Sequence, residues 1–256
     1  MSGSWILRQA VPCGAFRIFC FPYAGGTAAA YGAWQDEFPD WIEICAIEPP
    51  GRRHRMREEP FRRLPDLAEA VIAVLADEMN RPFAFFGHSL GALVAFEVAR
   101  RLSRDNGPSP AILFLSSAAA PQLRRDKRPV WNLPAPELIA DLAAYGGLPS
   151  DLLGDPALFE VFLPILRADL EVFGTYSCED RTRLDVPVCL YGGEQDETVT
   201  PARLCAWREL ADVVSVRLFP GGHFYLRDHR PLAAAIVHQL RNGIRTDLRG
   251  NACQCQ

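Results

Sequence analysis

The sequence predicts a single α/β domain, residues 1–256, built on a mostly parallel sheet with helices on both faces. Short apolar runs of strand length recur along the chain, and helical segments with one apolar face separate most of them. Most of the strand-like runs are nearly continuous in apolar character, as expected of strands covered on both faces. With 256 residues, 49% hydrophobic and 23% charged, the chain is long enough to bury a substantial core.

Six runs read as strands because they are short, bounded and rich in β-branched or aromatic residues. They are FRIFCF (16–21), WIEICAI (41–47), PFAFFG (82–87), AILFLSS (111–117), VPVCLYGG (186–193) and VVSVRLF (213–219). Helices are expected at 66–79, 90–103 and 231–244, where apolar residues recur at helical spacing. Three small residues of the second helix are expected to let it approach the sheet closely: Ala92, Ala95 and Ala99.

The region 121–183 lacks a convincing strand and carries two helical patterns, APELIADLAAYGGLPSDLL and DPALFEVFLPILRADLEVF. An insertion of this size between two strands of one sheet is most simply a helical lid over the carboxyl edge of the sheet. A helix pair packed away from the site is the alternative. Three apolar residues of the second pattern face either a substrate pocket or the core: Phe159, Phe162 and Leu166.

The stretch FFGHSLGALVAF places Ser89 between Gly87 and Gly91 in a G-x-S-x-G pattern. A predicted strand enters this stretch and a predicted helix leaves it, which is the context that a nucleophilic serine on a sharp turn needs. The glycines permit the turn, and the start of the helix supplies free N–H groups and a positive dipole end beside the hydroxyl. By itself the pattern also fits a small polar residue that caps a buried helix.

A serine nucleophile needs a base, and the base needs an orienting acid. His223 follows the strand 213–219 in FPGGHF, at the carboxyl end of a parallel strand, where a catalytic base belongs. A surface-loop histidine is the alternative. The remaining histidines lack this context: His54, His88, His229 and His238. His88 is expected to point away from the serine that it precedes.

The acid is expected at the end of another strand. YGGEQDETV follows the strand 186–193, and within it we choose Asp196, with Glu194 as the structural competitor. The chain order Ser89, Asp196, His223 is that of the α/β-hydrolases. The sequence therefore predicts an α/β-hydrolase fold with a helical lid.

An oxyanion hole needs two backbone N–H groups near the serine. Leu90, the residue after the nucleophile, is expected to supply one of them. The loop 21–26, in FCFPYAGGTAAAY, follows an earlier strand directly and is expected to supply the other. A plain strand-to-helix turn is the alternative for this loop.

The chain resembles the type II (external, editing) thioesterases of polyketide and non-ribosomal peptide synthases. The resemblance rests on FCFPYAGGTAAAYGAW, IEPPGRRHRMREEPF, FFGHSLGALVAFEVAR, LPILRADLEVFGTY, YGGEQDETVTP and FPGGHFYL, which span nearly the whole chain. It implies hydrolysis of acyl groups from the phosphopantetheine arm of acyl or peptidyl carrier proteins, with Ser89, Asp196 and His223 as the triad. It also implies Ala24 as the second oxyanion donor. Tyr23 stands where many members carry histidine and is expected to shape the mouth of the pocket, and Leu90 stands where many carry methionine.

No metal or other cofactor is expected, because the phosphopantetheine belongs to the substrate. The net charge of −4 argues against a general nucleic-acid binder. The N-terminus does not resemble a signal peptide, and no apolar run approaches the ~18 residues that suggest a membrane span. The eight cysteines are scattered, which favours reduced thiols in the cytoplasm. The terminal CQCQ offers too few ligands for a dedicated metal site. A monomer is the simplest expectation.

Three basic stretches are candidates for docking an acidic carrier protein, or are solvated loops: GRRHR (51–55), RR (62–63) and RRDKR (124–128). Two other functions fit a hydrolase scaffold. A carboxylesterase or lipase would use the same triad, and a non-catalytic binding protein would usually lack one of its members.

Overall fold

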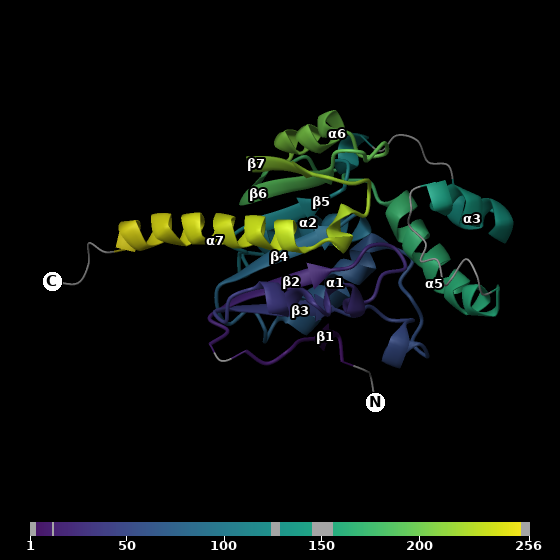
Figure 1. Cartoon of the computed structure of the whole chain (residues 1–256), viewed down its shortest axis with the longest axis horizontal. Helices are drawn as coiled ribbons and strands as arrows, with labels where there is room; N and C mark the ends of the chain where they lie inside the picture. Colours follow the sequence, from purple (N-terminus) through teal and green to yellow (C-terminus); the bar gives the residue numbers. More distant parts are fainter. Residues whose placement is uncertain (1–3, 12, 124–128, 145–155, 252–256) are drawn as a thin grey trace.

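The computed structural model describes residues 4–11, 13–123, 129–144 and 156–251 (Figure 1). Within these residues, seven strands form one sheet in the order β1-β3-β2-β4-β5-β6-β7. All neighbouring strands are parallel except β1, which is antiparallel to β3. The predicted mostly parallel sheet is therefore confirmed.

The six predicted strands all form, with bounds within two residues of those expected. The strands are β1 (Ile6–Leu7), β2 (Phe16–Phe21), β3 (Ile42–Ile47), β4 (Phe83–His88), β5 (Leu113–Ser116), β6 (Leu184–Gly193) and β7 (Ala211–Phe219). The two-residue strand β1 was not predicted, because so short a segment carries no periodic pattern.

The three predicted core helices also form. The α-helices are α1 (Leu64–Leu75), α2 (Leu90–Arg104), α3 (Ala135–Ala144), α5 (Pro156–Thr175), α6 (Pro201–Cys205) and α7 (Arg230–Asn251). The short 3₁₀ helices are η1 (Ala28–Tyr31), η2 (Trp34–Glu37), η3 (Arg53–Arg55), η4 (Pro121–Leu123), η5 (Val130–Asn132), η6 (Ala206–Glu209) and η7 (Tyr225–Arg227). Helix α1 ends four residues before the expected Met79, and α7 continues seven residues beyond the expected end.

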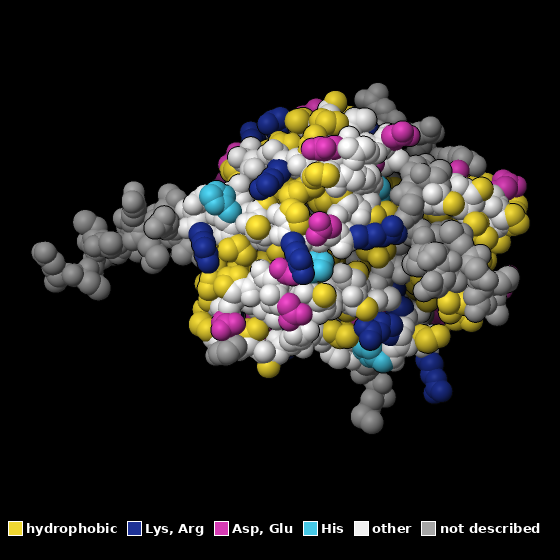
Figure 2. Space-filling model, viewed as in Figure 1, with side chains coloured by type: hydrophobic (Ala, Val, Ile, Leu, Met, Phe, Trp, Pro, Cys, Tyr) yellow, Lys and Arg dark blue, Asp and Glu magenta, His cyan; other side chains and the backbone are white. Residues whose placement is uncertain are grey.

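The segment between β5 and β6, here called the insertion, contains η4, η5, α3 and α5 in its described residues. Helices α3 and α5 lie at one end of the sheet in Figure 1 and share a small apolar core of their own, centred on Leu138 and Leu170. Figure 2 shows hydrophobic side chains at the surface of this end, and Val161 of α5 is 54% exposed. The insertion is thus an apolar helical layer beside the sheet.

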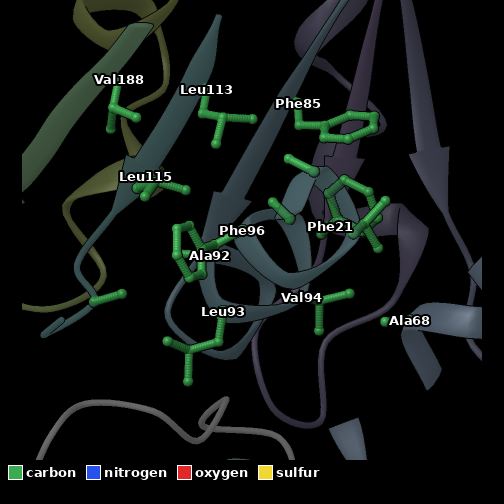
Figure 3. Packing of buried hydrophobic residues seen from close by; sticks show 14 of the residues in the cluster. Phe21, Ala68, Phe85, Ala92, Leu93, Val94, Phe96, Leu113, Leu115 and Val188 are labelled. Carbon is green, nitrogen blue, oxygen red and sulfur yellow. The ribbon is translucent and has the colours of Figure 1, made fainter. Parts of the chain in front are cut away.

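Each face of the sheet has its own apolar core. Helices α1 and α2 cover one face, and α7 covers the other together with η1 and η2. Figure 3 shows α2 lying against the sheet beside Phe85 and Leu113. The small residues Ala92, Ala95 and Ala99 of α2 are fully or almost fully buried, as expected for a helix that approaches a sheet closely. This packing fixes the N-terminus of α2 at the carboxyl end of β4.

Candidate active site

Ser89 lies on the turn between β4 and α2, with φ 55° and ψ −115°. A positive φ is uncommon for a residue other than glycine and costs about 1–3 kcal/mol, so the surrounding structure must hold it. The Ser89 N–H donates to the Ser116 carbonyl at 2.8 Å, and the Ser89 carbonyl accepts from Ala92 at 3.1 Å. Strand β5 and helix α2 therefore fix the turn from two sides.

The two glycines of the G-x-S-x-G pattern are required by close backbone contacts. A Cβ at Gly87 would lie 2.2 Å from the Gly91 carbonyl oxygen, and a Cβ at Gly91 would lie 2.1 Å from the Phe21 carbonyl oxygen. Both neighbours are backbone atoms and cannot move aside. The contact between Gly91 and Phe21 also brings the start of α2 against the end of β2.

His223 and Asp196 come together at the carboxyl ends of β7 and β6. His223 Nδ1 lies 2.8 Å from Asp196 Oδ2, and the side chains are 12% and 1% exposed. An ionised carboxylate only accepts hydrogen bonds, so Nδ1 carries the proton and leaves Nε2 able to accept one. The chemistry expected of a base and its orienting acid is therefore available to this pair.

The carboxylate of Asp196 is held by its own loop as well. Its Oδ1 accepts hydrogen bonds from the Thr198 N–H at 2.9 Å, the Thr198 hydroxyl at 2.7 Å and the Val199 N–H at 3.0 Å. Burial by itself would raise the pKa of Asp196, but the bonds from His223, Thr198 and Val199 outweigh it and hold the pKa well below its usual range. Glu194, the competing acid, is exposed.

The predicted oxyanion donors lie where the ends of β2 and β4 meet. Leu90 is the first residue of α2, so its N–H has no partner within the helix. Ala24 lies in the loop after β2, whose Gly26 N–H donates to the Tyr23 carbonyl at 2.8 Å. Because Gly91 touches the end of β2, the structure brings this loop and the start of α2 together.

Tyr23 is half-buried, and burial raises the pKa of its hydroxyl. Its ring meets the rings of Phe224 and His88 edge to face, with centroids 5.0 and 5.9 Å apart. The side chain therefore lies next to the loop that carries His223.

The three apolar residues of the insertion that were candidates for the substrate pocket lie on α5. Phe159 and Leu166 are buried in the core of the insertion. Phe162 packs against that core, and its ring and the Leu166 side chain reach the loop after β2: a Cβ at Gly25 would lie 2.4 Å from Phe162 and 3.3 Å from Leu166. Two of the three thus contact the candidate oxyanion loop.

Sequence reasoning missed an ion pair at this contact. Asp169 of α5 is 6% exposed, accepts the Gly25 N–H at 2.7 Å and also binds the guanidinium of Arg52. The available signal was an acid seven residues after Phe162 in an otherwise apolar helix face.

His88 also has a role that the sequence did not indicate. It is fully buried, its Nδ1 lies 2.8 Å from the Ser116 hydroxyl, and that hydroxyl lies 2.7 Å from the Tyr225 hydroxyl. Burial holds the pKa of His88 well below its usual range, which keeps the ring neutral. These two hydrogen bonds connect the end of β4 to the segment that follows His223.

Parts of the basic stretches are internal. Arg52 and Arg55 are buried, and each binds an acid within the fold, Asp169 and Glu58 respectively. These two arginines are therefore not available for docking a partner, because their charges are already paired inside the protein. Arg62 is exposed and pairs with Glu171 at 2.7 Å. The stretch 124–128 lies outside the described residues.

The described residues offer neither a cluster of metal ligands nor a membrane-spanning helix. No group of three or more His, Cys, Asp or Glu side chains there is arranged to hold a metal ion. None of the helices in the described part of the chain is both long and apolar enough to cross a membrane.

A family model described as thioesterase domain matches residues 16–241. The gramicidin S biosynthesis protein GrsT from Aneurinibacillus migulanus is 38% identical over 88% of this chain and 89% of its own. Thioesterase PikA5 from Streptomyces venezuelae is 35% identical over 89% of this chain and 82% of its own.

A solved structure is similar to this chain as well. The type II thioesterase BorB from the borrelidin biosynthetic cluster is 32% identical and superposes with a TM-score of 0.85, covering 94% of this chain and 99% of that chain. The similarity thus extends over nearly the whole length of both chains.

Proposed function

The chain belongs to the thioesterase domain family, and we propose that it hydrolyses acyl groups from the phosphopantetheine arm of acyl or peptidyl carrier proteins. The observation that carries the proposal is Ser89 on a strained turn at the carboxyl edge of the sheet, the edge that also holds the hydrogen-bonded Asp196–His223 pair. The relatives from antibiotic biosynthesis favour carrier-bound acyl groups that stall or misprime a synthase as the substrates.

The proposed reaction begins when Ser89 Oγ bonds to the thioester carbonyl carbon and His223 Nε2 takes the hydroxyl proton. Asp196 holds the imidazole tautomer and stabilises the imidazolium. The N–H groups of Ala24 and Leu90 bind the oxyanion, and losing one such donor typically costs about 3 kcal/mol. The C–S bond then breaks, and the pantetheine sulfur leaves as a thiol with the proton from His223.

The acyl-enzyme is hydrolysed by the same order of proton transfers, with water as the nucleophile and Ser89 as the leaving group. Water attacks the ester carbon while His223 accepts its proton, and Ser89 leaves with that proton as the acid is released. Only side chains, backbone N–H groups and water take part in these steps.

We further propose that the insertion serves as a lid and that the acyl chain enters beside it. The support is the contact of Phe162 and Leu166 with the loop after β2, next to the candidate oxyanion donor Ala24. Tyr23 then shapes the mouth of the pocket, and Phe159 affects the length of the pocket through the packing of the insertion's core. A cytoplasmic location fits the cysteines of the described residues, all of which are free thiols.

The experiment compares turnover of an acyl-carrier thioester with turnover of a simple oxygen ester of the same acyl group. We expect a much higher kcat/KM on the carrier substrate, and labelling of Ser89 by a fluorophosphonate probe. Ser89→Ala should abolish labelling and reduce turnover by orders of magnitude while remaining folded.

The other outcomes assign a different function. Preference for the oxygen ester would identify a carboxylesterase. Absence of both labelling and turnover would identify a non-catalytic protein. Undiminished turnover by Ser89→Ala would mean that another residue is the nucleophile.

A further inference from the structure

Helix α5 contacts the loop after β2 through a single face. Phe162, Leu166 and Asp169 are spaced four and three residues apart, so they project from the same side of the helix. Phe162 and Leu166 pack on Gly25, and Asp169 Oδ2 accepts the Gly25 N–H at 2.7 Å. This face therefore holds Gly25 by both packing and a hydrogen bond to a carboxylate.

Asp169 is also bound to a second loop. Its Oδ2 accepts from Nη2 of Arg52, which follows Gly51 in the loop after β3 and is 4% exposed. A charge buried this deeply is stable only when it is paired and hydrogen-bonded. The Asp169–Arg52 pair thus joins the insertion to two loops at the sheet edge.

Two hydrogen bonds constrain the peptide groups on the two sides of Ala24. The Tyr23–Ala24 peptide carries the Ala24 N–H, and its carbonyl accepts from Gly26 at 2.8 Å. The following Ala24–Gly25 peptide is fixed through the Gly25 N–H by Asp169. Because peptide groups are planar, fixing both of them fixes the direction of the Ala24 N–H.

The ion pair lies beside the proposed oxyanion hole. Arg52, Asp169, Tyr23 and Leu90 line one cavity of about 20 Å³. A cavity of this size holds about one water molecule, so it has no room for an acyl chain. The contact that links the pair to the proposed oxyanion hole is the hydrogen bond from the Gly25 N–H to Asp169.

We infer that Asp169 is a positioning residue: from α5 it fixes the loop after β2 and thereby orients the Ala24 N–H toward the oxyanion. The oxyanion hole is then correctly formed only when α5 is packed against the loop after β2. This inference rests on the proposed function.

The test uses Asp169→Ala, which loses the acceptor, and Asp169→Asn, whose amide oxygen can still accept the Gly25 N–H. We expect Asp169→Ala to lower kcat on an acyl-pantetheine thioester by about 10²-fold with little change in KM. Asp169→Asn should also lower kcat, but by less than Asp169→Ala does. In a Ser89→Ala background, Asp169→Asn should bind acyl-carrier protein with unchanged Kd, because the oxyanion exists only after attack.

The matched control is Glu171→Gln, two residues further along α5, which breaks an ion pair with Arg62 of the β3–α1 connection but leaves the bonds of Asp169 to Gly25 and Arg52 in place. It should leave kcat unchanged. Asp169→Ala could fail to fold because Arg52 loses its partner. In that case Asp169→Asn still offers an acceptor to Gly25, and the double variant Arg52→Gln/Asp169→Asn replaces the ion pair by two uncharged side chains that can hydrogen-bond. The double variant should recover kcat relative to Asp169→Asn.

Wild-type kcat in Asp169→Asn and Asp169→Ala would overturn the inference, as would a loss confined to KM or equal to the loss in Glu171→Gln. Failure of the proposed function is distinguishable. In that case wild-type protein itself would neither react with a fluorophosphonate nor hydrolyse the acyl-pantetheine thioester.

Discussion

Asp196 experiences two opposing effects on one carboxyl group. Burial disfavours its charged form, and the hydrogen bonds from His223, Thr198 and Val199 favour it. The hydrogen bonds prevail, so its pKa in the folded state lies well below its usual range. The same contacts that orient His223 therefore also contribute to folding stability.

Replacing Asp196 by Asn should reveal this contribution through pH. The stability from a carboxylate with a lowered pKa is fully present above its unfolded pKa of about 4, and is lost as pH falls through the folded pKa. We expect wild type to exceed Asp196→Asn by about 1–3 kcal/mol in unfolding free energy at neutral pH. That difference should shrink steadily below about pH 4. Urea denaturation at several pH values measures it.

The neighbouring acid supplies the control for this prediction. Glu194→Gln removes an exposed carboxylate from the same loop and should give no such pH-dependent difference. A gap between wild type and Asp196→Asn that stayed constant from neutral to acid pH would contradict the account of the Asp196 pKa.

At the scale of elements, the loops after β6 and β7 must touch for Asp196 to meet His223. Strands β6 and β7 pair in parallel up to Gly193 and Phe219, and the Gly221 N–H donates to the Gln195 side chain at 2.5 Å. A Cβ at Gly193 would lie 2.1 Å from the Gly222 carbonyl oxygen. The backbones of the two loops are thus in direct contact.

Gly193→Ala should separate these loops, because a backbone carbonyl cannot move aside like a flexible side chain. We expect a destabilisation of about 1–3 kcal/mol and a fall in kcat larger than the fraction unfolded explains. Thermal melts and steady-state kinetics measure both.

Gly222→Ala is the matched control from the other side of the contact. A Cβ there would lie 3.7 Å from its nearest neighbour, the Gln195 carbonyl, and Gly222 has no positive φ. It should be nearly neutral. Equal effects of the two substitutions would show that the close approach at Gly193 is not what aligns the pair.

At the scale of the whole molecule, charge is spread rather than concentrated. Figure 2 shows acidic and basic side chains interspersed over the visible face, and the chain has a net charge of −4. Arg52 and Arg55 are buried and paired with acids inside the fold. Any attraction of an acidic carrier protein must then come from local basic groups, and 124–128 is the densest basic stretch in the sequence.

We predict that kcat/KM on an acyl-carrier substrate falls by up to about tenfold when ionic strength rises from about 0.05 to about 0.5 M, because salt screens steering between proteins. Turnover of a short acyl-pantetheine thioester should change much less. The double variant Arg124→Gln/Arg125→Gln should flatten the salt dependence for the carrier substrate.

Arg241→Gln is the control for charge alone. Arg241 is exposed on α7, about 16 Å along the helix from its start near the sheet edge, and its loss should not alter the salt dependence. A carrier reaction insensitive to salt would exclude electrostatic docking through any of the basic stretches.

Much of the fold was readable from the sequence because its signals are local. Each strand of β2 through β7 is a short apolar run, and each core helix carries its own apolar periodicity. The proximity of Asp196 and His223 also followed, since the carboxyl ends of adjacent parallel strands share one edge. Strand β1 escaped prediction because two residues show no period.

The sequence by itself determined the α/β architecture. It also indicated Ser89, Asp196 and His223, because each of them follows the end of a strand that can be recognised in the sequence. Only the tertiary structure decided that Asp169 binds Gly25 and Arg52, residues 144 and 117 positions away. It also decided that Arg52 and Arg55 turn inward rather than toward a partner. Contacts over such separations leave no local pattern, because they depend on how α5 is seated on the sheet edge.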